Sequence, residues 1–360
     1  MSATLTAPKA QPATGMSHRL VSGGGGRWAL FYSRRSLVVT VVMLLAVAAL
    51  LIVELALGDY FIAPGDVIAT LQGHGTRVQD FIIYDIRLPR ALTALLVGAA
   101  LGLSGAIFQS LTRNALGSPD VIGFVEGASL GAVISILVLR GDQLQVVVGA
   151  MVGGLIVAAV VYFLSYKRGV QSHRLILVGI GVSVLLAASV EYLLLKADIV
   201  EAQRALVWLT GSLNDRGWEH VVGVGLGLLV LMPLCLLFAR RLTYLEMGDD
   251  LASALGVPVE SSRRWLLFLG TATTAIAVAA AGPIAFIALA APQVARRLSG
   301  RQTVALVPAA AMGAFLLLAS DLVAQWAMHP LQLPVGVATL VVGGVYLAVL
   351  LFFENRAGRD

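Results

Sequence analysis

The sequence is a succession of apolar runs, most about 20 residues long, separated by short polar or basic segments. A helix of that length crosses the hydrocarbon core of a bilayer, where every backbone polar group must find a partner within the protein. With 58% hydrophobic and 12% charged residues, the chain is too apolar to hide its side chains inside a water-soluble globule. The runs that predict spanning helices are residues 36–57, 91–111, 121–139, 144–165, 175–195, 220–239, 265–281, 303–327 and 335–353, with a shorter tenth over 283–295.

The basic residues predict how these helices are oriented. With ten crossings and a cytoplasmic N-terminus, 18 of the 25 lysines and arginines fall in the cytoplasm and 7 outside, as the positive-inside tendency requires. Nine crossings would move Arg356 and Arg359 outside, so the charges favour ten. We therefore predict a multi-pass protein of the cytoplasmic membrane with both termini in the cytoplasm. The net charge of +5 is explained by this topology and needs no nucleic acid.

The predicted organisation is one all-α membrane domain over residues 36–353. A flexible tail over 1–35 and a short tail over 354–360 flank it in the cytoplasm. The largest inner loop, about 240–264, holds a short amphipathic pattern that Asp249 is expected to cap and that Gly256 and Pro258 end. A helix this short cannot bury itself, so we interpret it as a contact for another protein. The alternative is a helix that lies idle at the membrane interface.

Motifs for chemistry are missing from the sequence. It has no phosphate-binding loop, its five histidines are far apart, and no nucleophile or zinc motif occurs. We predict a protein that is not an enzyme and that holds no metal or cofactor of its own. An ion-driven secondary transporter or channel remains an alternative, with Asp321 or Glu191 as the membrane acid. Asp321 fits a hydrogen-bonded interior better than a proton relay, and Glu191 fits a solvated helix end.

Several ordered motifs resemble one family. They are 87–90 (RLPR), 98–109 (GAALGLSGAIFQ), 114–119 (NALGSP), 248–256 (GDDLASALG), 282–292 (GPIAFIALAAP) and 333–336 (LPVG). In these the chain resembles the FecCD permeases, the membrane subunits of ABC importers for iron-siderophores, haem and cobalamin. The resemblance implies a type II importer bundle of ten helices. It also implies a second permease subunit, two copies of a cytoplasmic ATP-binding subunit and an extracytoplasmic binding protein.

The segment 117–124 (GSPDVIGF) looks most like ferric-catecholate permeases of the enterobactin type. The resemblance therefore implies a ferric siderophore as substrate, with cobalamin or haem as alternatives. Because catecholate permeases are commonly paired with a different permease, a heterodimer is expected rather than a homodimer.

The resemblance also assigns site residues. Arg87 and Arg90 match the family's outer arginines, which dock acids of the binding protein, whereas Gln325 stands where the family often has a further arginine. The family's ATPase coupling helix corresponds to Gly248, Asp249, Ala252, Leu255 and Gly256. The transport path is expected along the fifth and tenth helices. Its inner constriction would include Lys167, Arg168 and Ser172, and its outer one Trp208, Gly211 and Ser212.

Overall fold

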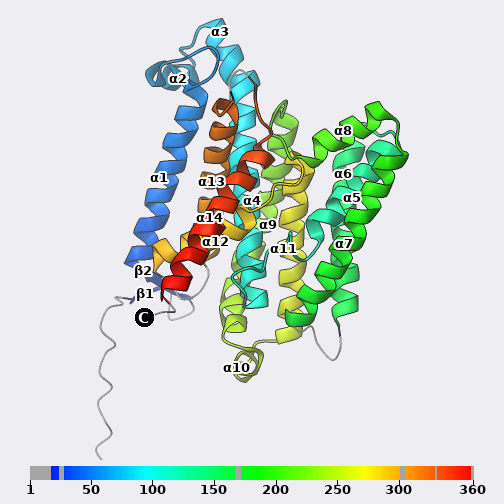
Figure 1. The fold of residues 1–360 in the computed structure, drawn as a ribbon. Coiled ribbons are helices and arrows are strands. Elements are labelled where there is room, and N and C mark those ends of the chain that lie inside the picture. Colours follow the sequence, from blue (N-terminus) through cyan, green and yellow to red (C-terminus); the bar gives the residue numbers. More distant parts are fainter. Residues whose placement is uncertain (1–17, 24–27, 167–171, 301–304, 329–330, 358–360) are drawn as a thin grey trace, which may run out of the picture.

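The computed structural model describes residues 18–23, 28–166, 172–300, 305–328 and 331–357, and Figure 1 shows them as a bundle of helices. The elements are β1 His18–Gly23, β2 Trp28–Ser33, α1 Arg34–Ala56, α2 Pro64–Leu71, α3 Arg77–Asp80, a π-helical turn Phe81–Arg87, α4 Leu88–Thr112, α5 Phe124–Leu137, α6 Gln143–Ser165, α7 Ser172–Lys196, α8 Ile199–Leu209, α9 Trp218–Glu246, α10 Asp249–Ala254, α11 Val259–Ala281, α12 Ile287–Ser299, α13 Leu306–Trp326 and α14 Val335–Ala357. Helices α2, α3 and α8 lie at one end of the bundle, called the α8 end, and α10 lies at the other, the α10 end (Figure 1).

The predicted ten-helix bundle is confirmed; α12 is as short as its predicted segment, and α5 is shorter than the predicted 121–139. Seven helices among the described residues are long and apolar enough to cross a membrane. Helices α5 and α12 have only 14 and 13 residues, or roughly 20 Å at 1.5 Å per residue. The sequence marks both starts: Pro119 and Gly123 precede α5, and Pro283 precedes α12. Each of these helices therefore begins inside the bundle rather than at its surface.

Helix α4 is the central helix. It packs against α13, α11, α9 and α12, and 78% of its most apolar window is buried, against 17% for α7. Glycines of α4 make this close packing possible: a Cβ added at Gly98 would overlap the backbone of Gly313, and one at Gly105 would overlap the carbonyl of Ala288. Small residues let helix backbones approach closely where lipid supplies no hydrophobic driving force.

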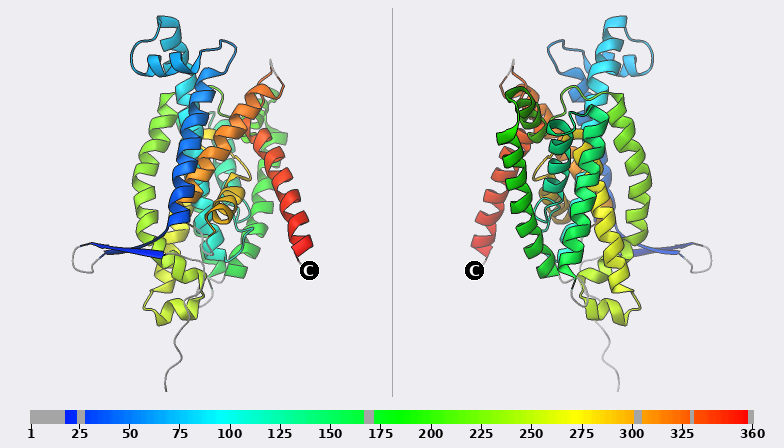
Figure 2. Two further views of the ribbon diagram at one scale, coloured as in Figure 1. Left: turned by 90° about the vertical axis from the view of Figure 1, so that its left-hand side faces the viewer. Right: turned by 90° about the vertical axis from the view of Figure 1, so that its right-hand side faces the viewer.

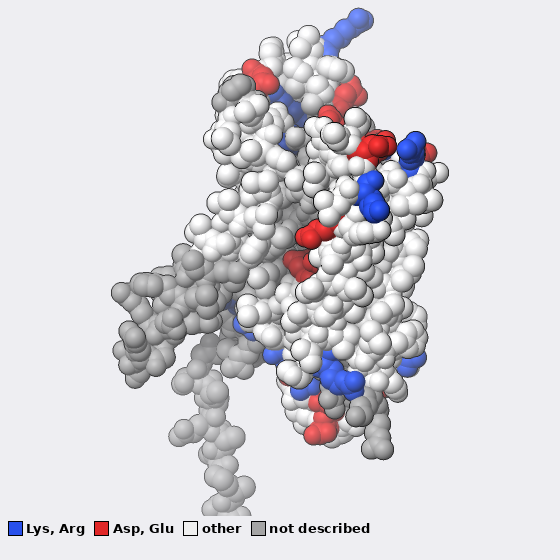
Figure 3. Space-filling view, turned by 45° about the vertical axis from the view of Figure 1, so that its right-hand side comes forward, with Lys and Arg blue, Asp and Glu red and all other residues white. Residues whose placement is uncertain are grey.

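The exterior of the bundle is suited to lipid. Helices α1, α6, α7 and α9 carry many exposed Leu and Val side chains. Figure 3 shows charged groups collected at the two ends of one face, with an uncharged band between them that a few acidic atoms interrupt part-way down. This distribution agrees with the predicted multi-pass membrane protein.

The segment predicted as a flexible N-terminal tail contains structure. Strands β1 and β2 pair antiparallel, with His18 opposite Ser33 and Gly23 opposite Trp28. Figure 2 shows this hairpin projecting sideways at the α10 end. Branched and aromatic residues in both stretches favour strands, a signal that the glycine-rich composition of the tail obscured. At the other terminus α14 continues to Ala357, beyond the predicted boundary at residue 353.

Candidate functional site

The arginine at the start of α4 is bound to the neighbouring helix α13. Arg90 forms a bidentate ion pair with Asp321 of α13, with Nε and Nη2 at 2.8 and 2.9 Å from the two carboxylate oxygens. Its Nη1 donates to Gln332 at 2.9 Å, and Gln325 donates to Asp321 at 2.9 Å. The Asp321 side chain is 0% exposed and that of Arg90 14%. The hydrogen-bonded interior predicted for Asp321 is what the structure shows.

Arg87 caps a different helix. Its Nη1 donates to the carbonyl of Leu55 at 2.7 Å and to that of Ala56 at 3.3 Å, and its Nη2 donates to Tyr60 at 2.6 Å. The last carbonyls of a helix have no partner within it, so a cation there is favourable. Both arginines predicted to dock a binding protein thus lie at the α8 end, and each has its guanidinium engaged within the chain.

A second acid lies in this cluster. Glu54 of α1 is 3% exposed and adjacent to Asp321 and Arg90. Neither of its carboxyl oxygens has a hydrogen-bond donor among the described residues. Two carboxyl groups therefore face one guanidinium, and Asp321 alone forms the bidentate pair.

At the other end, α10 occupies the place predicted for the coupling helix. Gly248 precedes its first residue and Gly256 follows its last turn. Ala252 is fully buried against the bundle, whereas Leu255 is 56% exposed. Asp249 is not the cap that the sequence suggested; it is the first helical residue, and its carboxylate binds two arginines, Arg113 and Arg263. The apolar side of α10 is therefore available to a partner.

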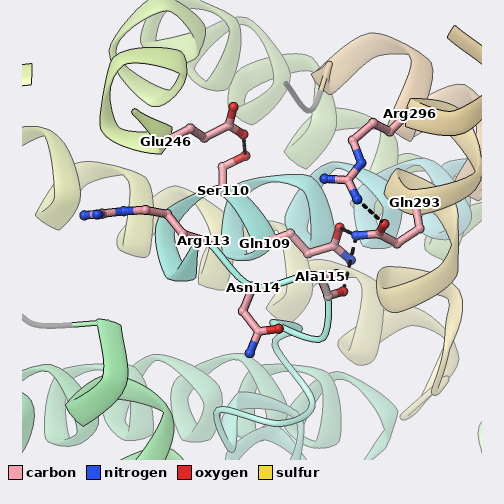
Figure 4. A pocket seen from close by; sticks show the side chains of 8 residues that line it. All are labelled: Gln109, Ser110, Arg113, Asn114, Ala115, Glu246, Gln293 and Arg296. Atoms are coloured by element: carbon pink, nitrogen blue, oxygen red, sulfur yellow. Dashed lines mark hydrogen bonds between the residues drawn. The ribbon is translucent and has the colours of Figure 1, made fainter. Parts of the chain in front are cut away.

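A polar cavity of about 160 Å³ lies at the same end of the bundle. In Figure 4 Arg296, Gln293 and Gln109 form a chain of hydrogen bonds, with Arg296 donating to Gln293 at 2.8 Å and Gln293 to Gln109 at 2.6 Å. On the other side Ser110 donates to Glu246. These contacts join the end of α4 to α12 and α9. The residues that line the cavity are Gln109, Ser110, Arg113, Asn114, Ala115, Glu246, Gln293 and Arg296.

The predicted outer constriction is a tightly packed turn. After α8, which contains Trp208, Gly211 has a φ of +68°, and an added Cβ there would overlap the carbonyl of Pro283. Ser212 donates its N–H to Ala281 at 2.8 Å, and Gly336 donates to Gly211 at 3.0 Å. The turn is thus clamped between the end of α11 and the start of α14.

One half-buried arginine supports this turn from the α9 side. Arg216 Nε donates to the carbonyl of Ser212 at 3.1 Å. Burial lowers the pKa of Arg216 from its ordinary value, and the neighbouring acids Asp215 and Glu219 oppose that shift. Of the inner constriction, Ser172 is the first residue of α7, and Lys167 and Arg168 lie outside the described residues.

Sequence reasoning missed a contact between the two segments that lead into the short helices α5 and α12. Asp120, in the segment that leads into α5, accepts a hydrogen bond from the backbone N–H of Phe286, which has a φ of +69° just before α12. The backbone at Ile122 lies against Gly179 of α7, and the Phe286 ring lies against Gly343 of α14. The segments that lead into α5 and α12 therefore meet beside α7 and α14, the helices expected to line the transport path. The only signals in the sequence were Pro119 and Pro283.

Comparison with known proteins agrees with this geometry. The model of the FecCD transport family matches residues 44–353. The chain is 46% identical over 302 residues to the ferric enterobactin transport system permease protein FepG of Escherichia coli, covering 84% of this chain and 92% of that protein. It is 37% identical over 309 residues to the Fe(3+)-citrate import system permease protein YfmE of Bacillus subtilis, covering 85% and 92%.

A solved structure is also similar. It is an inward-facing conformation of a metal-chelate type ABC transporter, 28% identical, with a TM-score of 0.80 over 87% of this chain and 98% of that chain. The helical bundle and these matches define a membrane-embedded transport protein rather than an enzyme. The chain belongs to the FecCD transport family.

Proposed function

We propose that the chain is the permease subunit of an ATP-driven importer that moves a ferric siderophore of the catecholate type across the cytoplasmic membrane. The observation that carries this proposal is the 46% identity to a ferric enterobactin permease over 92% of that protein's length. The α10 end would lie in the cytoplasm, as would both termini, because most of the basic residues are expected there.

The proposal includes two ATP-binding subunits that contact α10. The ATP that drives transport would be bound by these partner subunits, because this chain has no phosphate-binding loop of its own. Leu255 and Leu251 are 56% and 48% exposed on a helix that lies at the tip of the bundle (Figure 1). Exposed apolar groups on a short helix beyond the membrane are suited to burial in a groove of a partner.

The α10 contact is tested by Leu255→Arg. Because Leu255 is exposed, the variant is expected to fold, and we expect it to lose ATPase co-purification and siderophore uptake. Val78→Arg is the matched control for ATPase co-purification, since Val78 is equally exposed, at 56%, but lies in α3 at the α8 end, away from α10. Full uptake by Leu255→Arg would refute the ATPase contact.

The proposal also includes an extracytoplasmic binding protein that docks at the α8 end through Arg87 and Arg90. An acid of the binding protein would compete with neutral carbonyl oxygens for Arg87 but with a buried carboxylate for Arg90. Arg87 is therefore the better placed of the two to exchange partners. We expect Arg87→Glu to weaken docking in a pull-down, while Arg264→Glu, an exposed arginine at the α10 end, leaves it unchanged. Unchanged affinity of Arg87→Glu would exclude its role.

A second, different permease subunit would complete the path on the side of α7 and α14. The gates would be formed by the residues around Ser172 and by the turn at Gly211. Co-expression with candidate permeases and purification through a tag on this chain distinguishes the heterodimer from a homodimer, because only the heterodimer retains the second chain in equal amount.

The substrate is tested by uptake in a strain that lacks the gene, with and without the gene restored. The labelled substrates are a ferric catecholate, a ferric hydroxamate, haem and cobalamin. Restored uptake of the ferric catecholate alone supports the proposal. Restored uptake of cobalamin or haem alone would keep the architecture and overturn the iron-siderophore assignment. Uptake without any ATPase subunit would overturn the ATP-driven mechanism.

A further inference from the structure

The carboxylate of Asp249 joins α10 to two other helices through one oxygen atom. Oδ1 accepts a hydrogen bond from Nη2 of Arg113, the residue that ends α4, and another from Nη2 of Arg263 on α11 at 2.8 Å. Asp249 lies within α10 itself, at its first position. Any displacement of α10 therefore acts directly on the ends of α4 and α11.

The two arginines are held in different ways. Arg263 is only 5% exposed, and its Nη1 also binds Glu260 at 3.2 Å. Arg113 ends α4 in the left-handed region, with a φ of +51°, and its N–H bonds to the carbonyls of Gln109 and Ser110. Left-handed geometry is rare for a residue with a side chain and persists where the surroundings impose it. The two guanidinium groups thus converge on one acid, Arg263 from a buried position and Arg113 from a turn whose backbone is constrained.

One side of α10 is exposed and the other faces the bundle. Its apolar side, with Leu251 and Leu255, is exposed, while Ala252 and the Asp249 carboxylate face the bundle. Helix α4, which Asp249 reaches through Arg113, is the helix against which α9, α11, α12 and α13 pack. A push received on the exposed side would pass through the Asp249 pair to the centre of the bundle.

We infer that Asp249 is a positioning residue, which makes α4 and α11 move with α10 when a partner displaces it. This inference rests on the proposed function, since it takes the ATP-binding subunit as that partner. The Arg113 and Asp249 side chains are 38% and 44% exposed, so their ion pair contributes little to the stability of the fold. Its charge-assisted hydrogen bond still holds the two groups in a defined orientation. Without the carboxylate, α10 keeps its backbone connections and the packing of Ala252 but loses the link to α4.

The experiment measures coupling in proteoliposomes that hold the complete importer with its binding protein. ATP hydrolysis and ferric siderophore uptake are recorded together, and the readout is the number of ATP molecules hydrolysed per complex transported. For Asp249→Asn we expect this ratio to rise about two- to fivefold, the range for an exposed charge pair. Asp249→Glu, which keeps the charge, should recover much of the wild-type ratio. A residue needed only for folding would lower both rates in proportion and leave the ratio unchanged.

Arg113→Gln approaches the same link from the other helix. If Asp249 and Arg113 act as a unit, the double variant is no worse than either single variant. Glu260→Gln is the matched control: it removes the other acid bound to Arg263, keeps Asp249, and should leave the ratio at the wild-type value.

A wild-type ratio in Asp249→Asn, or single effects that add in the double variant, would overturn the inference. The proposed function fails differently, because in that case the unaltered importer shows no ATP-dependent siderophore uptake. If Asp249→Asn does not assemble, the other two variants still test the inference. It requires Arg113→Gln to raise the ratio of ATP hydrolysed to complex transported, and Asp249→Glu to leave that ratio near the wild-type value.

Discussion

The two ends of α4 both pair an arginine with an aspartate, but in different surroundings. At the α8 end, Arg90 and Asp321 are 14% and 0% exposed and bound through two parallel hydrogen bonds. At the α10 end, Arg113 and Asp249 are 38% and 44% exposed. The same chemistry therefore serves two purposes. A buried pair is expensive to separate because each charge would remain without water, whereas an exposed pair can exchange partners at little cost.

This difference assigns a fixed end and an adjustable end to one helix. The α8 end joins α1, α4 and α13 through Arg87, Arg90 and Asp321. The α10 end joins α4 to α9, α10 and α11 through contacts whose acidic partners, Glu246 and Asp249, are partly exposed. Motion driven from the α10 end would be expected to pivot about the α8 end. Four substitutions test the contrast, each measured by thermal unfolding of the purified protein in detergent.

The largest effect is expected for Arg90→Ala. It leaves the Asp321 carboxylate buried without its cation, and removing one partner of a buried ion pair costs about 3–5 kcal/mol. The measurement is the midpoint of unfolding, which should fall well below that of Arg77→Ala, an exposed arginine at the same end.

A double variant checks the reason for this loss. Arg90→Met with Asp321→Leu removes both charges and fills the space, so we expect it to regain most of the lost stability. If Arg90→Ala unfolds at the wild-type temperature, the α8 end is not fixed by this pair.

An intermediate effect is expected in the second half of α4, for Gly105→Ala. The new methyl group would overlap the carbonyl of Ala288 and push α12 away from α4. Overpacking of this kind costs about 1–3 kcal/mol. Gly181→Ala is the control, because nothing lies within 4 Å of a Cβ at that position of α7. Equal midpoints for the two variants would show that α4 and α12 do not pack closely.

A small effect is expected for Arg113→Gln at the α10 end. An exposed ion pair contributes about 0.2–1 kcal/mol, so the unfolding midpoint should fall only slightly and the loss should shrink further in high salt. A loss as large as that of Arg90→Ala would erase the contrast between the two ends.

The smallest effect is expected for Glu54→Gln. One guanidinium neutralises one carboxylate, and Asp321 already forms the bidentate pair with Arg90. A neutral amide at position 54 keeps the shape without a second acid, so the free energy of unfolding should change by less than about 1 kcal/mol. A large loss would mean that Glu54 shares in holding Arg90.

The sequence predicted the helices well because their signal is local. Apolar runs of spanning length and the pattern of α10 are read from neighbouring residues. The sequence could not show that α4 is mostly buried in the protein whereas α7 is mostly exposed, since both helices are uniformly apolar. Hydrophobicity distinguishes protein from lipid poorly when both are apolar.

The candidate site was predicted only in part, for a related reason. Arg87, Arg90 and the residues of α10 were singled out by short motifs, but the partners that the structure gives them are distant in sequence: Asp321 is 231 residues from Arg90, and Asp249 is 136 from Arg113. The contact between Asp120 and Phe286 joins two interruptions that looked like ordinary turns. Pairings of this kind depend on how helices are arranged in space, which periodicity does not encode.

Helices α5 and α12 begin inside the bundle, and this has a consequence for hydration. The first N–H groups of any helix have no acceptor within it, and hydrocarbon offers none, so irregular backbone at membrane depth must face protein or water. Asp120 supplies an acceptor for Phe286, and Pro119 and Ala285 supply acceptors for Phe124 and Ile287, the first residues of the two helices; the N–H groups that follow in the first turn of each helix need others. The side of the subunit where α5 and α12 start is thus unsuited to contact with lipid tails, and a wetted passage there would give these groups the solvent they require.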